Sequence, residues 1–458
     1  MTYSIITFGC QMNISDSEKI KTMLNKHSLI EIKNEKESDI VIINTCSVRE
    51  AAENRVFGLV ENLHDLKKKN KNERPFIIVT GCMPGRDHKN EIRRRFKDKI
   101  DCFIKINEIM ELPKIIDEYF GGKIIEAEDV SKKSKFNPND DIRNIDYINI
   151  NSNNESNFKA YIPIITGCNN FCSYCVVPFT RGREKSRDPE SIINEIKELK
   201  NRGYKEVTLL GQNVNSYDPE NNDYISKDNP YKHKFAQLLW EINNTGIERI
   251  YFTSSHPKDI DDEVIDALKL EHMGNYLHLA VQSGSNEILK LMNRHYTKEW
   301  YLEKIKKIRA VKPNIAIGTD IIVGFPGESD DEFNETVNLY KEADFDIAYT
   351  SIYSDRSGTV SIKMDNKIKF DIKKERWNIL HGLMEEIVLS KNKKYLNNIV
   401  SVLVEEYDDR KNYYIGHSSE QKIVKFKSED KNLIGNIVEI RINKVEEWNL
   451  YGDIIKKA

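Results

Sequence analysis

The sequence lacks a long hydrophobic run and lacks an excess of charge of either sign. No apolar stretch approaches the ~20 residues that a membrane span needs, and the N-terminus has no basic region ahead of an apolar one, as a signal peptide would. The formal net charge is −3, so a nucleic-acid partner would have to be met by a local basic patch. These absences predict a cytoplasmic protein with no membrane partner.

Cysteine is scarce, with 7 residues in a chain of 458. In a protein that is not exported, thiols stay reduced, which favours metal ligation or redox chemistry over disulfides. The remaining composition is that of a globular protein, with 39% hydrophobic and 31% charged residues. The length predicts about three domains.

Three of the cysteines follow apolar, strand-like runs in the first part of the chain. Each run ends two residues before a cysteine, and the three cysteines are Cys10, Cys46 and Cys82. Helical stretches separate the runs, and Ser15-x-x-Glu18 offers a capping box for the first helix. Continuous apolar strands alternating with helices predict a doubly wound α/β domain with a parallel sheet. Because parallel strands end on the same edge, the three thiols could converge there.

Three further cysteines form a tight cluster. Cys168, Cys172 and Cys175 have the spacing CxxxCxxC and follow the first of six further strand candidates. Six strand–helix units predict a partial (β/α)6 barrel whose function lies on the loops after the strands. Three thiolates in this register can hold three irons of a four-iron cluster and leave the fourth open to a small molecule. A zinc site without its fourth ligand is the alternative.

The chain divides into four segments by composition. Short alternating runs near the C-terminus predict a small all-β barrel, and a polar, helix-poor stretch predicts a linker. The predicted segments are an N-terminal domain at 1–122, the linker at 123–157, the partial barrel at 158–392 and the β-barrel at 393–458.

The clustered cysteines and the strand ends that follow them resemble those of the radical S-adenosylmethionine (SAM) enzymes. This resemblance implies that the open iron of a 4Fe-4S cluster binds SAM, whose cleavage gives a 5′-deoxyadenosyl radical. It places Tyr174 near the SAM adenine. The residues expected to bind the cofactor are Tyr174, Gly211, Gln212, Asn213, Gln282, Ser283, Arg294, Ile322 and Gly324.

The dispersed cysteines stand in segments that resemble the N-terminal domain of the methylthiotransferases. These segments are 7–13, 44–49 and 81–82. The resemblance implies a second, auxiliary 4Fe-4S cluster on Cys10, Cys46 and Cys82, whereas spacing alone leaves three buried structural cysteines as an alternative. Cys102 stands in the middle of a strand-like run, so we expect it to be a core residue and no ligand.

Further segments are typical of the methylthiotransferase branch that acts on N(6)-dimethylallyladenosine in tRNA. They are 11–13, 174–183 and 252–257, and the C-terminal barrel looks like a TRAM domain, which helps to hold RNA. The resemblance implies conversion of N(6)-dimethylallyladenosine, 3′ to the anticodon, into its 2-methylthio derivative. The implied partners are the tRNA anticodon loop and a low-potential electron donor such as flavodoxin or ferredoxin, while the sequence does not name the sulfur donor.

Substrate contacts are expected at Arg181, Arg183 and His256, since guanidinium groups bind phosphate through two hydrogen bonds. His256 could instead order its own loop. One rival function is the same chemistry on threonylcarbamoyladenosine in tRNA or on a ribosomal-protein aspartate. Another is a non-catalytic iron–sulfur regulator that binds RNA, against which the strand-end motifs argue.

Three positions depart from the methylthiotransferase pattern. Met83-Pro84-Gly85 stands where an Ala-Gln pair is common, and Asp355 stands where proline is frequent. Gly416-His417 replaces a Gly-Arg pair in the C-terminal barrel, so one expected RNA contact is lost or depends on pH.

Overall fold

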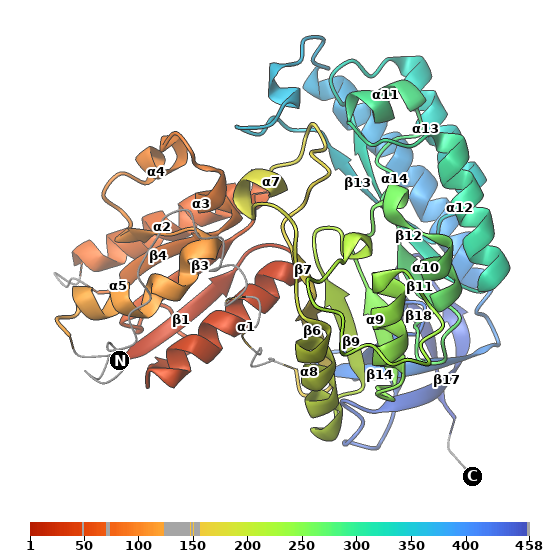
Figure 1. Ribbon diagram of the computed structural model, residues 1–458, viewed down its shortest axis with the longest axis horizontal. Helices are drawn as coiled ribbons and strands as arrows, with labels where there is room; N and C mark the ends of the chain where they lie inside the picture. The colour runs from red at the N-terminus through yellow and green to blue at the C-terminus, as the bar shows by residue number, and fades with distance from the viewer. Residues whose placement is uncertain (48–49, 70–73, 123–146, 148–149, 151–155, 456–458) are drawn as a thin grey trace.

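The computed structural model describes the whole chain except residues 48–49, 70–73, 123–146, 148–149, 151–155 and 456–458. The predicted linker therefore lies mostly outside the described residues. Figure 1 shows three parts, which are an N-terminal α/β domain, a central half-open barrel and a C-terminal β-barrel. This architecture confirms the predicted fold class.

The N-terminal domain is a five-stranded parallel sheet in the order β2-β1-β3-β4-β5. Alternate residues of the central strand β3 enter different cores, because Ile40 and Ile42 pack on one face and Val41 and Ile43 on the other. The chain adds β2 on one side of β1 and then β3, β4 and β5 on the other side, so the strand order reverses between β1 and β3. Open α/β sheets bind their ligands at such a point. The strands are β1 (Thr2–Thr7), β2 (Ile30–Glu31), β3 (Ile40–Thr45), β4 (Phe76–Gly81) and β5 (Cys102–Phe103).

Helices cover both faces of this sheet (Figure 1). Apolar residues of α1 and α5 contribute to one core, and those of α2, α3 and α4 contribute to the other. The helices are α1 (Gln11–Lys26), α2 (Glu50–Lys69), α3 (Cys82–Arg86), α4 (Glu91–Phe96) and α5 (Leu112–Tyr119), with the 3-10 helix η1 (Ile106–Glu111) before α5.

The central part contains six parallel strands in two three-stranded sheets. The isolated bridges Ile250–Met273 and Ser255–Leu279 join the sheets at β10 and β11. Among the described residues no pairing joins β6 to β13, so the barrel stays open on that side. The strands are β6 (Lys159–Pro163), β9 (Glu206–Leu210), β10 (Arg249–Phe252), β11 (Tyr276–His278), β12 (Ala316–Val323) and β13 (Ile347–Ile352).

Amphipathic helices cover the outside of the half-open barrel (Figure 1). A short antiparallel pair, β7 and β8, flanks the loop that carries the clustered cysteines. The barrel helices are α7 (Val177–Thr180), α8 (Pro189–Asn201), α9 (Lys234–Asn243), α10 (Asp262–Ala267), α11 (Asn286–Leu291), α12 (Lys298–Val311), α13 (Asp330–Ala343) and α14 (Phe370–Lys393). The remaining short elements are β7 (Ile165–Thr166), β8 (Lys185–Ser186), and the 3-10 helices η3 (Val214–Ser216), η4 (Pro257–Asp259) and η5 (Ser361–Lys363).

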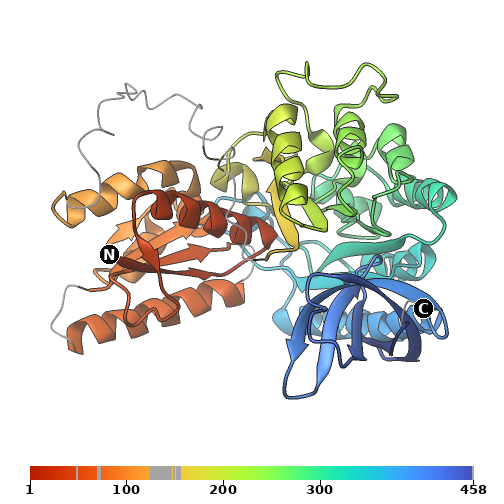
Figure 2. The same ribbon diagram turned by 90° about the horizontal axis from the view of Figure 1, so that it is seen from below.

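The C-terminal strands close into a five-stranded barrel that packs against the amino-terminal ends of the central strands (Figure 2). Arg249 donates hydrogen bonds to the carbonyl oxygens of Ser401, at 2.8 Å, and His417, at 3.1 Å. Lys159 pairs with Glu405 at 2.6 Å. The strands are β14 (Ile399–Asp408), β15 (Tyr413–Ser418), β16 (Ile423–Lys427), β17 (Ile437–Val445) and β18 (Leu450–Ile454). Within the described part of the chain, no helix has both the length and the apolar character that crossing a membrane requires.

Candidate active site

The loop 168–175 lies at the carboxyl end of the first barrel strands and is held from several sides. Gly167 precedes it at a φ of +80°, and a Cβ there would come within 2.0 Å of the Arg183 carbonyl oxygen, so only glycine fits. The Ser173 hydroxyl donates to the Leu291 carbonyl at 2.8 Å. These contacts place the loop against the segment between α7 and β8 and against the end of α11.

The three thiols of this loop lie near one another, with Cys168 and Cys172 buried and Cys175 half-buried. Burial raises the pKa of Cys168 to about 11 and that of Cys175 to about 12, and the neighbouring thiols add to both shifts. Arg294 donates to the Cys172 sulfur at 3.4 Å, and the Val177 amide donates to the Cys175 sulfur at 3.5 Å. Hydrogen bonds of this kind favour the thiolate form that binds metal.

The donor set fits an iron–sulfur cluster. No three His, Cys, Asp or Glu side chains among the described residues meet in the geometry of a single-ion site. A four-iron cluster spaces its cysteines more widely than one ion does, because each thiolate binds a different iron. Soft thiols without carboxylate or imidazole competitors suit such a cluster.

The dispersed cysteines come together at one edge of the N-terminal sheet. Cys10 is the residue before α1, Cys46 follows β3 directly, and Cys82 is the first residue of α3. A Cβ placed on Gly9 would lie 3.0 Å from the Cys46 Cβ, and the Cys10 and Cys82 thiols interact electrostatically. Cys46 and Cys82 are buried, while Cys10 is exposed. Three soft thiols at this edge also suit an iron–sulfur cluster.

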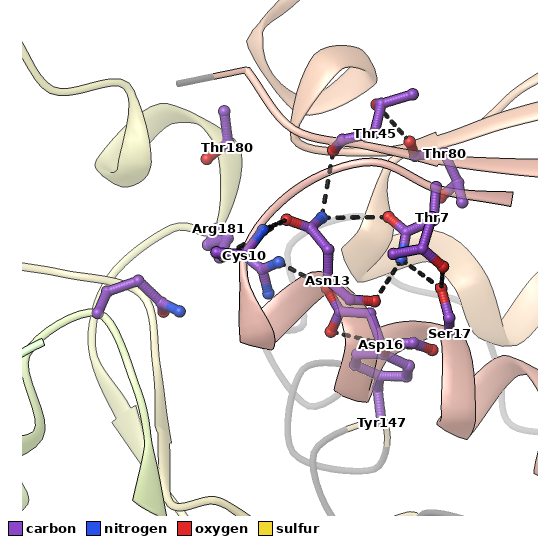
Figure 3. A network of polar contacts seen from close by, with 12 residues as sticks. Thr7, Cys10, Asn13, Asp16, Ser17, Thr45, Thr80, Tyr147, Thr180 and Arg181 are labelled. Atoms are coloured by element: carbon purple, nitrogen blue, oxygen red, sulfur yellow. Dashed lines mark hydrogen bonds and ion pairs between the residues drawn. The ribbon is translucent and has the colours of Figure 1, made fainter. Parts of the chain in front are cut away.

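Asn13 connects the loops that carry Cys10 and Cys46 (Figure 3). Its amide nitrogen donates to the Asn44 side-chain oxygen and to the Thr45 carbonyl, each at 3.2 Å. Its side-chain oxygen accepts from the Cys10 amide at 3.3 Å. Residues 11–13, which are typical of the branch that acts on N(6)-dimethylallyladenosine, therefore have a local role, because Asn13 holds two cysteine-bearing strand ends together.

Two cavities occupy the barrel lumen. The first, of about 620 Å³, is lined by Cys175 and by Ser47, which follows Cys46. The second, of about 610 Å³, is lined by Gln11 next to Cys10 and extends to Trp448 in the C-terminal barrel. Asp320 lines both cavities. The lumen therefore reaches from the clustered cysteines to the C-terminal barrel, with residues of the N-terminal domain at its wall.

Three of the expected cofactor residues line the first cavity: Tyr174, Gln282 and Ile322. The Tyr174 ring meets Phe325 edge to face, with centroids 6.4 Å apart. Gln282 has a φ of +73°, a strained conformation for a residue with a side chain, which functional sites often contain.

Three other expected cofactor residues directly follow β9 and order the cysteine loop. The Gln212 side-chain oxygen accepts from the Gly167 amide at 2.6 Å, directly before the cysteine cluster. Asn213 is buried and donates to Asp259 at 2.7 Å. Gly211 packs so closely that a Cβ would lie 2.4 Å from an Ile165 methyl carbon. The structure gives these residues loop-ordering contacts, and they do not line the first cavity.

The remaining three also make contacts within the protein, and Arg294 does so through the Cys172 sulfur described above. Ser283 is fully buried, with its hydroxyl 3.3 Å from that of Thr336. Gly324 has a φ of +70°, its amide donates to Glu328 at 2.8 Å, and a Cβ would meet the Lys373 side chain at 2.3 Å. Both residues shape the turns after β11 and β12.

Arg181 lies elsewhere than the sequence led us to expect. Its guanidinium is buried between the two domains and pairs with Asp16 at 2.5 Å (Figure 3), beside the Cys82 thiol. Burial raises the pKa of Cys82, and Arg181 opposes that rise. A tRNA phosphate does not reach this position, since the guanidinium is already enclosed by protein. The expected substrate contact is therefore corrected to a contact with the dispersed cysteines.

Arg183 and His256, the other expected substrate residues, differ in exposure. Arg183 is exposed, and its guanidinium lies 4.4 Å from the centre of the Phe171 ring. His256 is buried and accepts a hydrogen bond from the Lys258 amide at 3.3 Å. Burial, together with the Arg294 and Lys258 charges, lowers the pKa of His256 to about 2, so its ring is neutral.

An ion-pair group that the sequence did not single out borders the first cavity. Glu53 accepts from the Ser47 hydroxyl at 2.9 Å and pairs with Arg86 at 2.9 Å and with Arg356 at 3.9 Å. Arg356 comes from the loop after β13 and joins the cavity wall to the N-terminal domain. Because its partner lies some three hundred positions earlier, no local pattern marks this pair.

Comparisons with known proteins agree with this geometry. Family models match the Radical SAM superfamily at residues 162–340, an uncharacterized protein family, UPF0004, at 2–104, and the TRAM domain at 393–455. The radical SAM methyltransferase TsrM from Kitasatospora setae, with cobalamin and a 4Fe-4S cluster bound, has a similar fold. Its TM-score is 0.51 at 15% identity, over 77% of this chain and 72% of that one.

Relatives with much higher identity span nearly the whole chain. The tRNA-2-methylthio-N(6)-dimethylallyladenosine synthase of Thermoanaerobacter sp. (strain X514) is 43% identical, covering 99% of this chain and 93% of its own length. Those of Caldicellulosiruptor saccharolyticus and Clostridium botulinum (strain Okra / Type B1) are 42% identical, covering 99% of this chain and 92% and 97% of their own lengths. The radical SAM match implies SAM and a 4Fe-4S cluster as cofactors. The chain belongs to the family of tRNA-2-methylthio-N(6)-dimethylallyladenosine synthases, which are radical SAM methylthiotransferases.

Proposed function

We propose that the protein converts N(6)-dimethylallyladenosine, 3′ to the anticodon of tRNA, into 2-methylthio-N(6)-dimethylallyladenosine. The observation that carries the proposal is the first cavity, which Cys175 lines from one side and Ser47, next to Cys46, from another. A base in this cavity would be within reach of both sets of cysteines. The 42–43% identity to synthases of this name supports the choice of substrate.

The clusters and two molecules of SAM would supply the radical, the sulfur and the methyl group, because one SAM would be cleaved to the radical and the other would donate its methyl group to the sulfur. When bound, a cluster on Cys168, Cys172 and Cys175 would deliver the electron that cleaves SAM, and a second on Cys10, Cys46 and Cys82 would present the sulfur. A radical route suits the target, because the C–H bond at carbon 2 of adenine offers neither an acidic proton nor a leaving group. The electron donor would be a low-potential protein such as flavodoxin or ferredoxin.

The protein's own residues would position these groups. Tyr174, Gln282 and Ile322 would contact SAM in the first cavity. Arg294 would hold Cys172 through its hydrogen bond, and its own orientation is fixed by the Tyr296 hydroxyl at 2.9 Å. Apolar side chains around Tyr174 would exclude water from the radical.

The lining of the first cavity favours a dimethylallyl group over a threonylcarbamoyl group. Ile321, Phe370 and Trp377 offer an apolar surface. A threonylcarbamoyl group would bring a carboxylate into a lining that already contains the Asp320 carboxylate, and the only cation among the described lining residues, Arg356, also lies 3.9 Å from Glu53. Burying an unpaired carboxylate is costly.

RNA would approach from the side of the C-terminal barrel, which the TRAM match covers. The target base would leave its stack to enter the lumen, as single-stranded RNA recognition usually requires. We assign residues 1–122 to the auxiliary-site domain, 158–392 to the radical SAM barrel and 393–458 to RNA binding. A non-catalytic regulator would have no need of a cavity of about 620 Å³ beside Cys175.

The test is an anaerobic reconstitution followed by mass spectrometry of tRNA nucleosides. The full-length protein, loaded with iron and sulfide, receives SAM, a reductant and tRNA that carries N(6)-dimethylallyladenosine but no methylthio group. We expect the 2-methylthio nucleoside, and none from matched tRNA that carries threonylcarbamoyladenosine. Product only from the second tRNA, or no product with both clusters loaded, would contradict the proposal.

A further inference from the structure

Arg181 is a barrel residue that ends in the N-terminal domain. It follows α7 and its buried guanidinium donates to Asp16 on α1 at 2.5 Å (Figure 3). The same guanidinium interacts electrostatically with the Cys82 thiol. One side chain therefore connects the barrel, helix α1 and a member of the dispersed cysteine set.

The arginine has little freedom to move. Its side chain is 4% exposed and that of Asp16 is 1% exposed. The other Asp16 oxygen accepts from the Tyr147 hydroxyl at 2.9 Å, so the carboxylate is held from both sides. A charge-assisted pair without water keeps a defined geometry, and losing one partner would leave a buried charge uncompensated.

The backbone brings α7 and α3 unusually close. A Cβ on Gly85 would lie 2.8 Å from the Thr180 carbonyl oxygen and 2.9 Å from its Cα, so a larger residue would push α3 away from α7. Cys82 is the first residue of α3, and Arg181 directly follows Thr180. Gly85, one of the departures from the methylthiotransferase pattern, thus permits the contact that sets Arg181 against Cys82.

The segment that contains α7 joins the two cysteine sets. It begins at Cys175, whose sulfur accepts from the Val177 amide, and the Arg181 amide donates to the Val177 carbonyl at 2.9 Å. The chain therefore passes from a ligand of one set to a cation at the other within little more than one helical turn.

We propose that Arg181 is a positioning residue of the auxiliary cluster, which places a fixed positive charge beside Cys82. This inference rests on the proposed second cluster. A nearby positive charge raises the reduction potential of an iron–sulfur cluster. A residue that only fastened one domain to the other would leave that potential unchanged.

The experiment isolates the auxiliary cluster in the full-length chain. A background with Cys168→Ala, Cys172→Ala and Cys175→Ala is reconstituted anaerobically, and iron, sulfide, the electron paramagnetic resonance spectrum and the midpoint potential are measured. Arg181→Met removes the charge, and Arg181→Lys keeps it. Arg187→Met is the matched control, because Arg187 is equally buried and pairs with Glu195 at 2.5 Å, yet contacts no cysteine among the described residues.

We expect Arg181→Met to lower the reduction equilibrium constant at least tenfold, which is about 59 mV for one electron. Arg181→Lys should recover most of the shift, and Arg187→Met should match the background. Failure of Arg181→Met alone to assemble the cluster would also support the inference. An unchanged potential in Arg181→Met, or an equal shift or loss in Arg187→Met, would overturn it. If the background itself binds no iron, the second-cluster proposal fails first, and the role of Arg181 fails with it.

Discussion

Two buried arginines, Arg181 and Arg294, each act on one of the cysteine sets. Arg294 donates a hydrogen bond to the Cys172 sulfur, and Arg181 interacts electrostatically with the Cys82 thiol. Arg181 was expected to bind phosphate, and that expectation captured the chemistry of guanidinium but not its partner. The partners are Asp16 and Cys82, which lie far away in the sequence. Whether an arginine binds an RNA phosphate or an acidic group of the protein depends on whether its guanidinium is buried. Burial at a domain boundary leaves no local pattern in the sequence.

The two cysteine sets should be separable by single substitutions. Cys46→Ala should leave SAM cleavage within about twofold of the parent and abolish the methylthio product, because the clustered cysteines are untouched. Chromatography of 5′-deoxyadenosine and mass spectrometry of nucleosides measure the two outcomes. Cys102→Ala is the control and should keep both activities, since Cys102 lies in β5 and packs on the N-terminal core, as expected from the sequence. If the Cys46→Ala variant still formed the methylthio product, the role assigned to the dispersed cysteines would be wrong.

Arg183 offers an exposed charge for the substrate. Arg183→Ala should weaken tRNA binding about 3- to 10-fold and reduce the salt dependence by roughly one charge, since one phosphate contact would be lost. Filter binding at several salt concentrations measures both effects. Arg202→Ala is a matched control, because Arg202 is also exposed and lies 5.3 Å from the centre of an aromatic ring, that of Tyr204. Equal losses in the two variants would count against a specific role for Arg183.

At the scale of elements, the strand ends were predictable and the helix starts were not. Apolar runs before Cys10, Cys46 and Cys82 correspond to β1, β3 and β4. The capping box expected at Ser15-x-x-Glu18 is wrong, because α1 begins at Gln11 and Asn13 supplies the side-chain contact to the Cys10 amide. Ser15 and Glu18 are buried within the helix, where a capping pattern has no role. The two-residue strand β2 is too short to leave an apolar run, whereas β5 falls within the strand-like run around Cys102.

The close contact of α3 and α7 can be tested with glycine substitutions. Gly85→Ala should destabilise the protein by about 1–3 kcal/mol, because the new Cβ meets the Thr180 backbone. Gly58→Ala is the control in α2, where a Cβ meets nothing within 4 Å, and it should stabilise the helix by up to about 1 kcal/mol. Urea unfolding under anaerobic conditions measures both. A stable Gly85→Ala variant would mean that α3 and α7 can move apart freely.

At the scale of the whole molecule, the order of domains followed from the sequence, but their contacts did not. The repeated strand–helix units and the short C-terminal strands predicted the three parts. The attachment of the C-terminal barrel depends on pairs such as Arg249 with Ser401 and Lys159 with Glu405, which join distant segments. His417 pairs with Glu405 at 3.0 Å and therefore contacts the protein itself. The sequence predicted that an RNA contact at this position would be lost or would depend on pH.

Two glutamates between the central barrel and the C-terminal barrel should affect the stability of the protein in opposite directions as the pH changes. Burial raises the pKa of Glu206 from 4.5 to about 7. Burying the charged carboxylate lowers the free energy of unfolding, and this loss is absent below pH 4.5 and complete above pH 7. Glu206→Gln should therefore stabilise the protein by roughly 1–3 kcal/mol at pH 8 and have little effect at pH 5. Urea unfolding at both pH values tests this.

Glu405 supplies the comparison for that experiment. Although burial alone would raise the pKa of Glu405, hydrogen bonds from His417 and Lys159 lower it to about 2. Its contribution to stability is present above pH 4.5 and disappears as the pH falls toward 2. Glu405→Gln should therefore destabilise the protein at pH 8. The same sign of change for both variants at pH 8 would contradict the assigned charge states.

The short segment from Cys175 through α7 to Arg181 has a consequence for how the RNA must be handled. Because only five residues separate Cys175 from Arg181, which pairs with Asp16 on α1, we expect a rotation of the N-terminal domain to move the loop 168–175 as well. Under the proposed function, the radical source and the sulfur source would then keep a constant separation during turnover. The base would have to move between them.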